Sequence, residues 1–317
     1  MFKLRLCILA TAITLSASAS LAQVKLDFAW PDGLQATVTQ TKSRVRTGTP
    51  APHSVTLSYD MKAIKGSAGT VISFTNVRLK PSKASSALSD TDKQLQLFAQ
   101  AALPPYVVKE SGEFDRLEDA AAFKVAYLRF FKQVLPAMYE VPQLRQLLEQ
   151  VTSEDFLTAA VGGEWNQNVG FWVDATLDMG ETYSSEYEGS VPLLPGRTIK
   201  MQSKFRVIKE VPCTRTGQAR KCVELEMRTT PDQADMAAAI DSFSRQFALP
   251  SPGKGEVMES IDVEENIRLV TETDGLIPHQ ITTYKRVVAS IRSGDERKSM
   301  SEVQESSVSY TYRSNAP

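Results

Sequence analysis

The sequence is poor in the side chains on which most metal and nucleophilic chemistry depends. Its 317 residues include two histidines, His53 and His279, and three cysteines. The histidines are not at H-x-x-x-H spacing, so a zinc site with His and Cys ligands would require both to meet in space. The G-x-S-x-G, G-x-G-x-x-G and G-x-x-x-x-G-K-[ST] motifs are all missing from the sequence. We therefore expect no metal site, no cofactor and no catalytic residue of these classes.

An excess of either charge is also missing. The chain carries 36 Lys and Arg against 37 Asp and Glu, a formal net charge of −1. Binding to nucleic acid through its phosphates needs a basic surface, so we expect no nucleic-acid partner. A composition of 42% hydrophobic and 23% charged residues is typical of a folded globular protein rather than a disordered one.

Long hydrophobic runs are missing beyond the N-terminus. Two positive charges within residues 1–5 precede an apolar run at 6–15, and small residues follow up to Ala22. This is the pattern of a secretory signal peptide cleaved before Gln23. The alternative of a membrane anchor is disfavoured because the run is about half the ~20 residues needed to cross a bilayer. We expect an exported chain, in the periplasm or outside the cell, with no transmembrane segment after processing.

Two cysteines remain once Cys7 leaves with the signal peptide. In an oxidising compartment, Cys213 and Cys222 are expected to form a structural disulfide. Their spacing is not the C-x-x-C of a redox catalyst. A two-residue type II′ turn at Gly217-Gln218 would place the cysteines directly opposite each other in a hairpin. That register requires a β-bulge near Pro212 to bring the apolar residues of both strands to one face.

Hydrophobic periodicity divides residues 23–317 into blocks that we expect to form one α+β domain. Alternation predicts strands within 24–80, a hairpin at 106–117 and further strands within 171–228. Helical spacing predicts a helical block over 89–161 that ends at Gly162-Gly163. It also predicts a helix over 231–248 capped by Thr230. Phe171 is expected to open a strand.

The last segment predicts three long strands, at 256–273, 276–292 and 296–313. About 15 residues at ~3.3 Å each span roughly 50 Å, which exceeds the usual strand length. A twisted sheet of such strands is expected to bend around a filling. The expected fold class is α+β, a long, strongly curved, half-barrel-like antiparallel sheet packed on several amphipathic helices. Whether the strands form one sheet or two is left open by the sequence.

Three aromatic residues are the only candidates for a ligand site. Trp165, Phe171 and Trp172 lie close together in the sequence, and such residues either complete a core or line a pocket. The neighbouring Asn166, Gln167 and Asn168 suggest a loop that enters a strand, so that one tryptophan could lie at the rim of the sheet.

Acidic residues offer a weaker alternative. Glu186 and Glu188 share one face of an extended segment near Glu181. A glycosidase requires at least a pair of acidic residues at its active site. A solvated strand face explains them equally well. The acidic residues of a second group likewise indicate a solvated sheet face, with Ca²⁺ binding as an alternative that lacks the D-x-[DN]-x-[DN]-G pattern. This second group comprises Asp262, Glu264 and Glu265.

The order of elements resembles that of uncharacterised exported bacterial domains of unknown function. Tyr106-Val107-Val108, then Ser111-Gly112-Glu113-Phe114 and a helix from Glu118, is similar to their "V-V-x-x-x-G-x-F" hairpin and helical block. The segment from Thr273 to Pro278 is similar to their late hairpin. No catalytic residue comes with this resemblance. The expected architecture is also similar to the half-barrels that carry lipoproteins or lipids across the bacterial periplasm, an analogy that does not fix function.

These observations favour a non-enzymatic exported protein that binds a hydrophobic small molecule, a lipid or an envelope protein on a curved sheet. The alternative is a structural or assembly component of the cell envelope without a ligand pocket. A hydrolase built from scattered acidic residues is a third reading.

Overall fold

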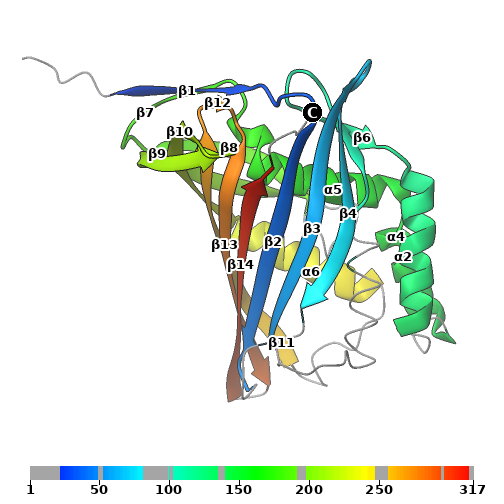
Figure 1. Cartoon of the computed structure of the whole chain (residues 1–317). Helices are drawn as coiled ribbons and strands as arrows, with labels where there is room; N and C mark the ends of the chain where they lie inside the picture. Colours follow the sequence, from blue (N-terminus) through cyan, green and yellow to red (C-terminus); the bar gives the residue numbers. More distant parts are fainter. Residues whose placement is uncertain are drawn as a thin grey trace, which may run out of the picture.

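The computed structural model describes residues 22–48, 53–80, 99, 103–134, 140–190, 198–246, 256–293 and 296–313. Within this part, β-strands predominate, and α-helices lie beside them (Figure 1). Residues 1–21 of the predicted signal peptide and most of 89–103, the first part of the predicted helical block, lie outside the described residues.

Eleven strands form one open antiparallel sheet, which we call the main sheet. Its strand order is β6-β5-β4-β3-β2-β14-β13-β11-β10-β9-β8. The strands are β2 (Leu34–Arg46), β3 (His53–Gly66), β4 (Gly69–Lys80), β5 (Tyr106–Val108), β6 (Phe114–Leu117), β8 (Tyr183–Ser190), β9 (Thr198–Arg215), β10 (Gln218–Pro231), β11 (Glu256–Glu272), β13 (Pro278–Ser293) and β14 (Glu296–Tyr312). Because β2 pairs with β14, the early and late strand-rich segments belong to a single sheet.

The three predicted long strands are confirmed. Strands β11, β13 and β14 contain 17, 16 and 17 residues and pair with one another along nearly their whole length. Their side chains alternate between two environments, as the period of a strand requires. In β2, for example, Leu34, Ala36 and Val38 are buried, while residues between them are partly exposed. One face of the main sheet therefore faces the core.

A smaller three-stranded sheet lies against one end of the molecule. It contains β1 (Gln23–Phe28), β7 (Ala175–Asp178) and β12 (Asp274–Gly275), in the order β12-β1-β7. The Asp274-Gly275 segment is thus more than the predicted turn between two long strands, because it also pairs in parallel with β1. Gly275 has a φ of 113°, and a Cβ there would lie 2.9 Å from the carbonyl oxygen of Ala29. Glycine permits this close approach.

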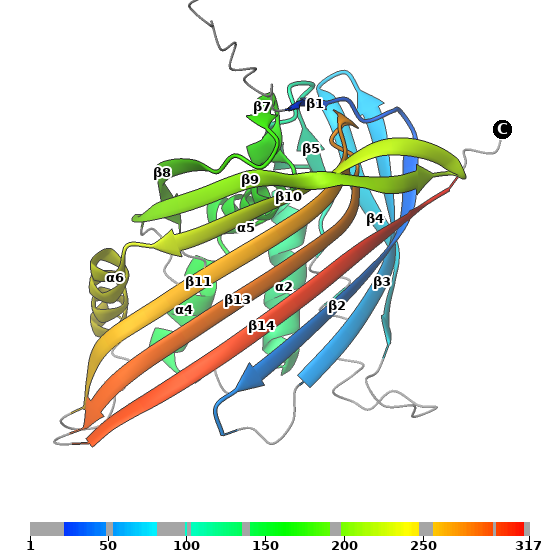
Figure 2. The ribbon, with the colours of Figure 1, turned by 90° about the vertical axis from the view of Figure 1, so that its left-hand side faces the viewer.

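The helices lie on one face of the main sheet (Figure 2). They are α2 (Ala120–Val134), α4 (Pro142–Val151), α5 (Glu154–Asn168) and α6 (Gln233–Gln246), with a short 3₁₀ turn η1 (Gly170–Trp172). Helix α5 packs on β6 and on α2, while α6 packs on β9 and β11. No helix among the described residues is long and apolar enough to cross a membrane.

Helix α5 and the turn after it correct three expectations: the helix end at Gly162-Gly163, the loop at 166–168 and the strand at Phe171. It starts at the cap Ser153, whose Oγ accepts a hydrogen bond from the Phe156 amide at 3.3 Å, and it continues through Gly162-Gly163 to Asn168. The predicted helix end at the two glycines is therefore wrong. Each mid-helix glycine costs about 1 kcal/mol, which the packing of Leu157 and Trp165 on this helix offsets. Phe171 lies in η1, not in a strand.

The predicted cap of α6 is also wrong. Asp232 caps this helix, because its Oδ1 accepts a hydrogen bond from the Asp235 amide at 2.9 Å. Thr230 and Pro231 instead belong to the end of β10 and pair with β9. The predicted cap lies two residues before the observed one, because sheet pairing satisfies the backbone of Thr230 and Pro231.

The β9–β10 hairpin contains the predicted disulfide in a different register. Thr216 and Gly217 have φ angles of 52° and 79° and form the two-residue turn, so that Cys213 lies opposite Arg220. Cys222 lies opposite Val211, and the disulfide joins cysteines displaced by two positions, with a Cα–Cα distance of 5.9 Å. Positive φ at both turn positions is typical of type I′ rather than type II′.

The predicted bulge exists at another position. The register shifts between Glu224 and Leu225, where Ile208 is the extra residue of β9, and Pro212 pairs regularly with Lys221. The bulge at Ile208 brings Val207 opposite Leu225 on the buried face, which is the effect that the sequence required of a bulge.

Candidate functional site

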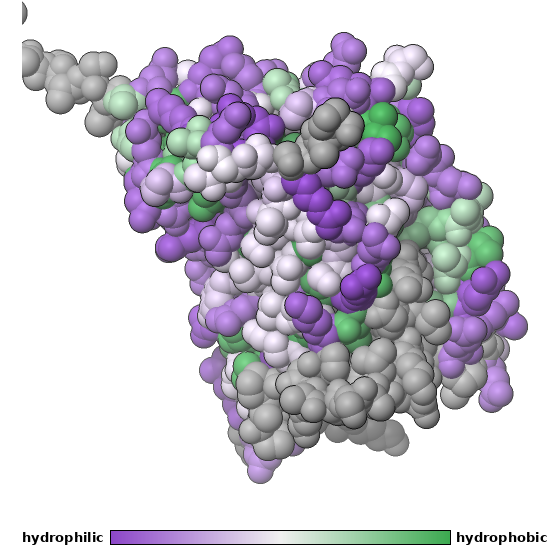
Figure 3. Space-filling view, viewed as in Figure 1, coloured by the Kyte–Doolittle hydropathy of each residue, from purple (hydrophilic) through white to green (hydrophobic). Residues whose placement is uncertain are grey.

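A large hollow lies between the inner face of the main sheet and helices α4, α5 and α6. Its volume is about 1460 Å³. We call it the hollow. Its apolar lining side chains come from both layers, and they are Val55, Phe156, Ala159, Ala160, Met201, Pro231, Met236, Val263, Ile281 and Val308. Viewed from the side shown in Figure 3, the outer surface is mainly hydrophilic, with small scattered hydrophobic areas.

The floor of the hollow changes from apolar to polar along the strands. On β13 the inward residues are Ile281, Thr283 and Lys285, because alternate residues of a strand share a face. Their partners on β14 are Val308, Ser306 and Gln304, respectively. The Ile281–Val308 pair is buried beside the hydrophobic core, whereas the Lys285–Gln304 pair lies farther from it. This gradient suits a ligand with an apolar part and a polar part.

The helical wall of the hollow combines polar and acidic residues with three small residues of α5. Ala159, Ala160 and Gly163 line it from α5. A Cβ built on Gly163 meets no heavy atom within 4 Å, whereas a Cβ on the preceding Gly162 would lie 2.9 Å from Cδ1 of Phe114. Gly162 therefore faces the packed core and Gly163 faces open space. The short side chains of this helix leave the hollow unfilled.

Three positive side chains and five carboxylates line the hollow; the positive ones are Lys42, Arg44 and Lys285, and the carboxylates are Glu149, Asp155, Glu164, Glu265 and Glu305. Lys42 on β2 and Lys285 on β13 both line the hollow, and among the described residues neither forms an ion pair. Arg44, also in the lining, is already engaged, because its Nε lies 2.6 Å from Oε1 of Glu302. Burial would raise the pKa of Glu302, but hydrogen bonds from Arg44, Gln304 and Arg46 outweigh burial and lower this pKa to about 2.

The predicted acidic face from Asp262 to Glu265 is divided between the two sides of the sheet. Glu265 lines the hollow and accepts a hydrogen bond from Nε2 of Gln167 on α5 at 3.4 Å. Glu264 lines a separate, polar depression on the other face, beside Arg268 and Tyr284. The expectation that all three acids are solvated on one face is therefore wrong for Glu265, because neighbouring residues of a strand point to opposite faces.

The aromatic ligand-site candidates lie in the hydrophobic core. Trp165 and Trp172 are 4% and 0% exposed, and Phe171 is half-buried. The ring of Trp165 packs edge-on against Trp30, and its Nε1 donates to the carbonyl of Gly112 at 2.9 Å. None of the three lines the hollow. Their burial explains these residues as part of the core. A role in ligand binding stays a prediction.

Glu186 and Glu188, the acidic pair of the hydrolase hypothesis, lie on the edge strand β8. Glu186 and Glu188 are exposed on β8, and Glu181 is exposed in the loop before it. Glu188 accepts a hydrogen bond from Thr198 at 3.5 Å. None of these three acids lines the hollow.

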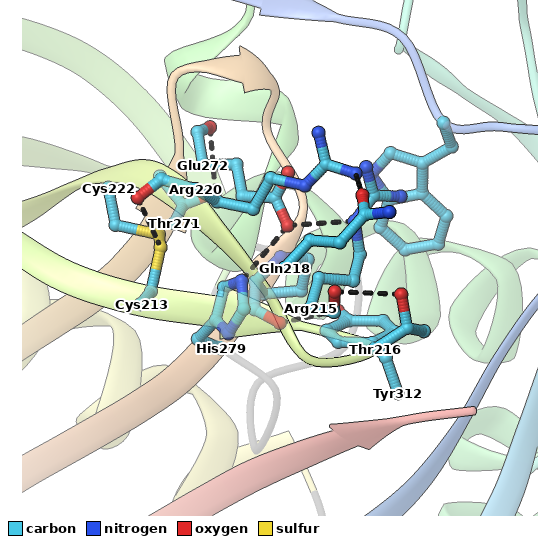
Figure 4. A network of polar contacts seen from close by, with 12 residues as sticks. Cys213, Arg215, Thr216, Gln218, Arg220, Cys222, Thr271, Glu272, His279 and Tyr312 are labelled. Atoms are coloured by element: carbon cyan, nitrogen blue, oxygen red, sulfur yellow. Dashed lines mark hydrogen bonds and ion pairs between the residues drawn. A yellow bond between two sulfur atoms is a disulfide. The ribbon is translucent and has the colours of Figure 1, made fainter. Parts of the chain in front are cut away.

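The histidines are separated. His53 begins β3, rather than lying in a loop, and its side chain lies outside the described part. His279 begins β13 as part of a polar network around the disulfide (Figure 4). A ring nitrogen of His279 and the sulfurs of Cys213 and Cys222 lie within 4.8 Å of one another. No sequence motif indicates this cluster, because the pairing of distant strands produces it.

Comparisons with known proteins assign no family. No family model matches the chain, and no curated protein matches its sequence. The chain is similar to a solved structure described as "Lipid-protein interactions in lipovitellin", with a TM-score of 0.44 and 12% identity over 91% of this chain. It spans about a quarter (26%) of that longer chain. A second structure, OpdQ of Pseudomonas aeruginosa, gives a TM-score of 0.15 and 7% identity over 88% of this chain and 98% of that chain.

Proposed function

We propose that this protein is a non-enzymatic binding protein that holds an amphipathic ligand with a hydrocarbon tail in the hollow. The observation that carries the proposal is the composition of this space. It has a floor that changes from apolar to polar along the strands, small residues at its centre on α5, and two lysines that form no ion pair among the described residues. Its volume exceeds the roughly 300–1,000 Å³ of typical small-molecule pockets, so an extended ligand fits better than a compact metabolite.

The tail of the ligand would lie against Ile281, Val308 and Met236. Each buried CH₂ contributes about 0.8 kcal/mol, so a long chain supplies affinity without any specific polar contact. The head group would lie near Lys285 and Lys42. An anionic head would supply the ion-pair partner that these lysines lack among the described residues.

We further infer that the main sheet bends over the helices as a half-barrel within one domain, residues 23–317. The placement of all the described helices on one face supports this, as do the long paired strands (Figures 1 and 2). Export to the periplasm or the cell exterior is supported by the Cys213–Cys222 disulfide, which needs oxidising conditions. N-terminal sequencing of protein recovered from these compartments should begin at Gln23, and an unprocessed Met1 would contradict export by this route.

The test of binding uses the delipidated protein and a defined probe, the fluorescent fatty acid cis-parinaric acid. Wild type should bind it saturably. The variant Gly163→Phe places a ring into the hollow, and we expect it to weaken binding at least tenfold, about 1.4 kcal/mol. Gly163→Ala is the matched control at the same position. It adds one methyl group to open space and should bind as wild type does.

Two results would refute the proposal. One is the lack of saturable binding by wild type. The other is equal affinity of the Gly163→Phe and Gly163→Ala proteins, provided that both give the circular dichroism spectrum of wild type. The first result would favour the reading of an envelope assembly component without a ligand pocket.

A further inference from the structure

A second group of residues that could bind a ligand lies near the tip of the β9–β10 hairpin, outside the hollow. The disulfide sulfurs of Cys213 and Cys222 and a ring nitrogen of His279 lie within 4.8 Å of one another (Figure 4). Cys222 is fully buried, whereas Cys213 and His279 are half-buried. Two sulfur atoms and one imidazole nitrogen thus lie close together at a place that is partly accessible to solvent.

A buried carboxylate holds the imidazole in place. Oε1 of Glu272 lies 3.0 Å from Nε2 of His279, and the side chain of Glu272 is 3% exposed. The ring of Tyr312 contacts the imidazole edge-on, with a centroid distance of 5.4 Å. Histidines that bind metals characteristically have such a carboxylate partner, which fixes the ring and raises its basicity.

The charges around the cluster favour a divalent cation once the disulfide is opened. Arg215 lies with its Nε 3.0 Å from Oε1 of Glu272, so these two opposite charges offset each other. The neutral imidazole adds no charge. Two cysteine thiolates then contribute two negative charges, which one divalent cation neutralises. Among such cations, Zn²⁺ prefers thiolate and imidazole ligands.

We propose that the reduced form of this protein binds one Zn²⁺ ion through Cys213, Cys222 and His279, with Glu272 as the positioning residue. A dithiol reductant supplies two electrons and two protons to the disulfide and is itself oxidised to a disulfide. Zn²⁺ then displaces the two thiol protons into solvent and forms two Zn–S bonds and one Zn–N bond. The fourth position is open to water or a further ligand. This site does not depend on the proposed ligand-binding function.

The test begins with the full chain reduced anaerobically by a phosphine, which avoids a competing thiol. Zn²⁺ is titrated against a chromophoric chelator, and Co²⁺ is used as a spectroscopic substitute. The reduced protein should bind one Zn²⁺ per chain and, with Co²⁺, should show thiolate charge-transfer absorption and the visible bands of a tetrahedral ion. The oxidised protein should show neither.

Variants that leave the cysteines intact separate the site from the fold. Glu272→Gln should weaken Zn²⁺ binding by about 10–100-fold. His279→Ala removes a ligand and should weaken it further. His53→Ala is the matched control, because it removes the other histidine, which pairs with Arg44 at the opposite end of the sheet. It should bind Zn²⁺ as wild type does.

The proposal is overturned if the reduced wild type binds no Zn²⁺, if its Co²⁺ complex lacks thiolate bands, or if His279→Ala binds as tightly as wild type. Loss of the folded circular dichroism spectrum on reduction, without recovery when Zn²⁺ is added, also overturns it.

Discussion

Alanine substitutions at two adjacent glycines of α5 should change stability in opposite directions. A mid-helix glycine is about 0.8–1 kcal/mol less favourable than alanine. At Gly163 the new methyl group meets no heavy atom within 4 Å, so no steric cost reduces the free energy gained from the higher helix propensity of alanine. We expect Gly163→Ala to raise the free energy of unfolding by about 0.5–1 kcal/mol.

At Gly162 the same methyl group would lie 2.9 Å from Cδ1 and 3.1 Å from Cε1 of Phe114. The Phe114 ring packs against Tyr106, with a centroid distance of 5.8 Å, and it has little room to withdraw. Overpacking of this kind costs about 1–3 kcal/mol, which equals or exceeds the helix gain. We expect Gly162→Ala to be destabilised by up to about 2 kcal/mol, so that the two variants differ by about 1–3 kcal/mol.

Urea unfolding followed by tryptophan fluorescence measures this difference, because Trp165 is buried in the same helix. Equal m-values in the two variants and wild type would show that the folded states expose similar surface. The reasoning would be refuted if both variants were stabilised equally, or if Gly162→Ala were the more stable of the two.

Three further predictions concern charge and the disulfide. Lys285→Gln should weaken binding of cis-parinaric acid about tenfold by removing a charged hydrogen-bond donor, while binding of the uncharged methyl ester should be unchanged; an equal loss for both probes would argue against a head-group role. Since the folded pKa of Glu302 is lowered to about 2, its contribution to stability is present above pH ~4.5 and is lost as pH falls toward 2. The partners are partly exposed, so this contribution should be about 1 kcal/mol, and acid unfolding of Glu302→Gln should lack it; an unchanged profile would contradict the assignment. Replacing both Cys213 and Cys222 by alanine should lower the free energy of unfolding by about 2–3 kcal/mol, because the disulfide closes a short loop, and unaltered thermal unfolding would refute this.

Much of the fold was predictable because it depends on local patterns. The long runs of alternating apolar and polar residues in β11, β13 and β14 predicted long strands. The short polar segments between these runs predicted where each strand ends. The end of α5 was missed because glycine is a weak stop signal when tertiary packing continues on the helix. The predicted turn of the hairpin differs from the observed one by one position, because a β-branched Thr216 gives no indication of its positive φ.

The hollow could not be predicted from the sequence. Its lining combines residues of β2, α5, α6, β13 and β14, and only the three-dimensional packing shows which side chains leave space. The cluster of His279 with the two cysteines has the same origin. It forms because β10 pairs with β11 in a register that sets Cys222 opposite Glu272, and the chain then returns through His279.

The contact between β2 and β14 joins segments near the two ends of the chain, as the Arg44–Glu302 ion pair illustrates with a separation of 258 residues. The centre of the sheet therefore cannot close until the final strand has been synthesised. Non-local pairing of this kind slows folding. Until then, the strands on either side of this contact lack their neighbour in the sheet.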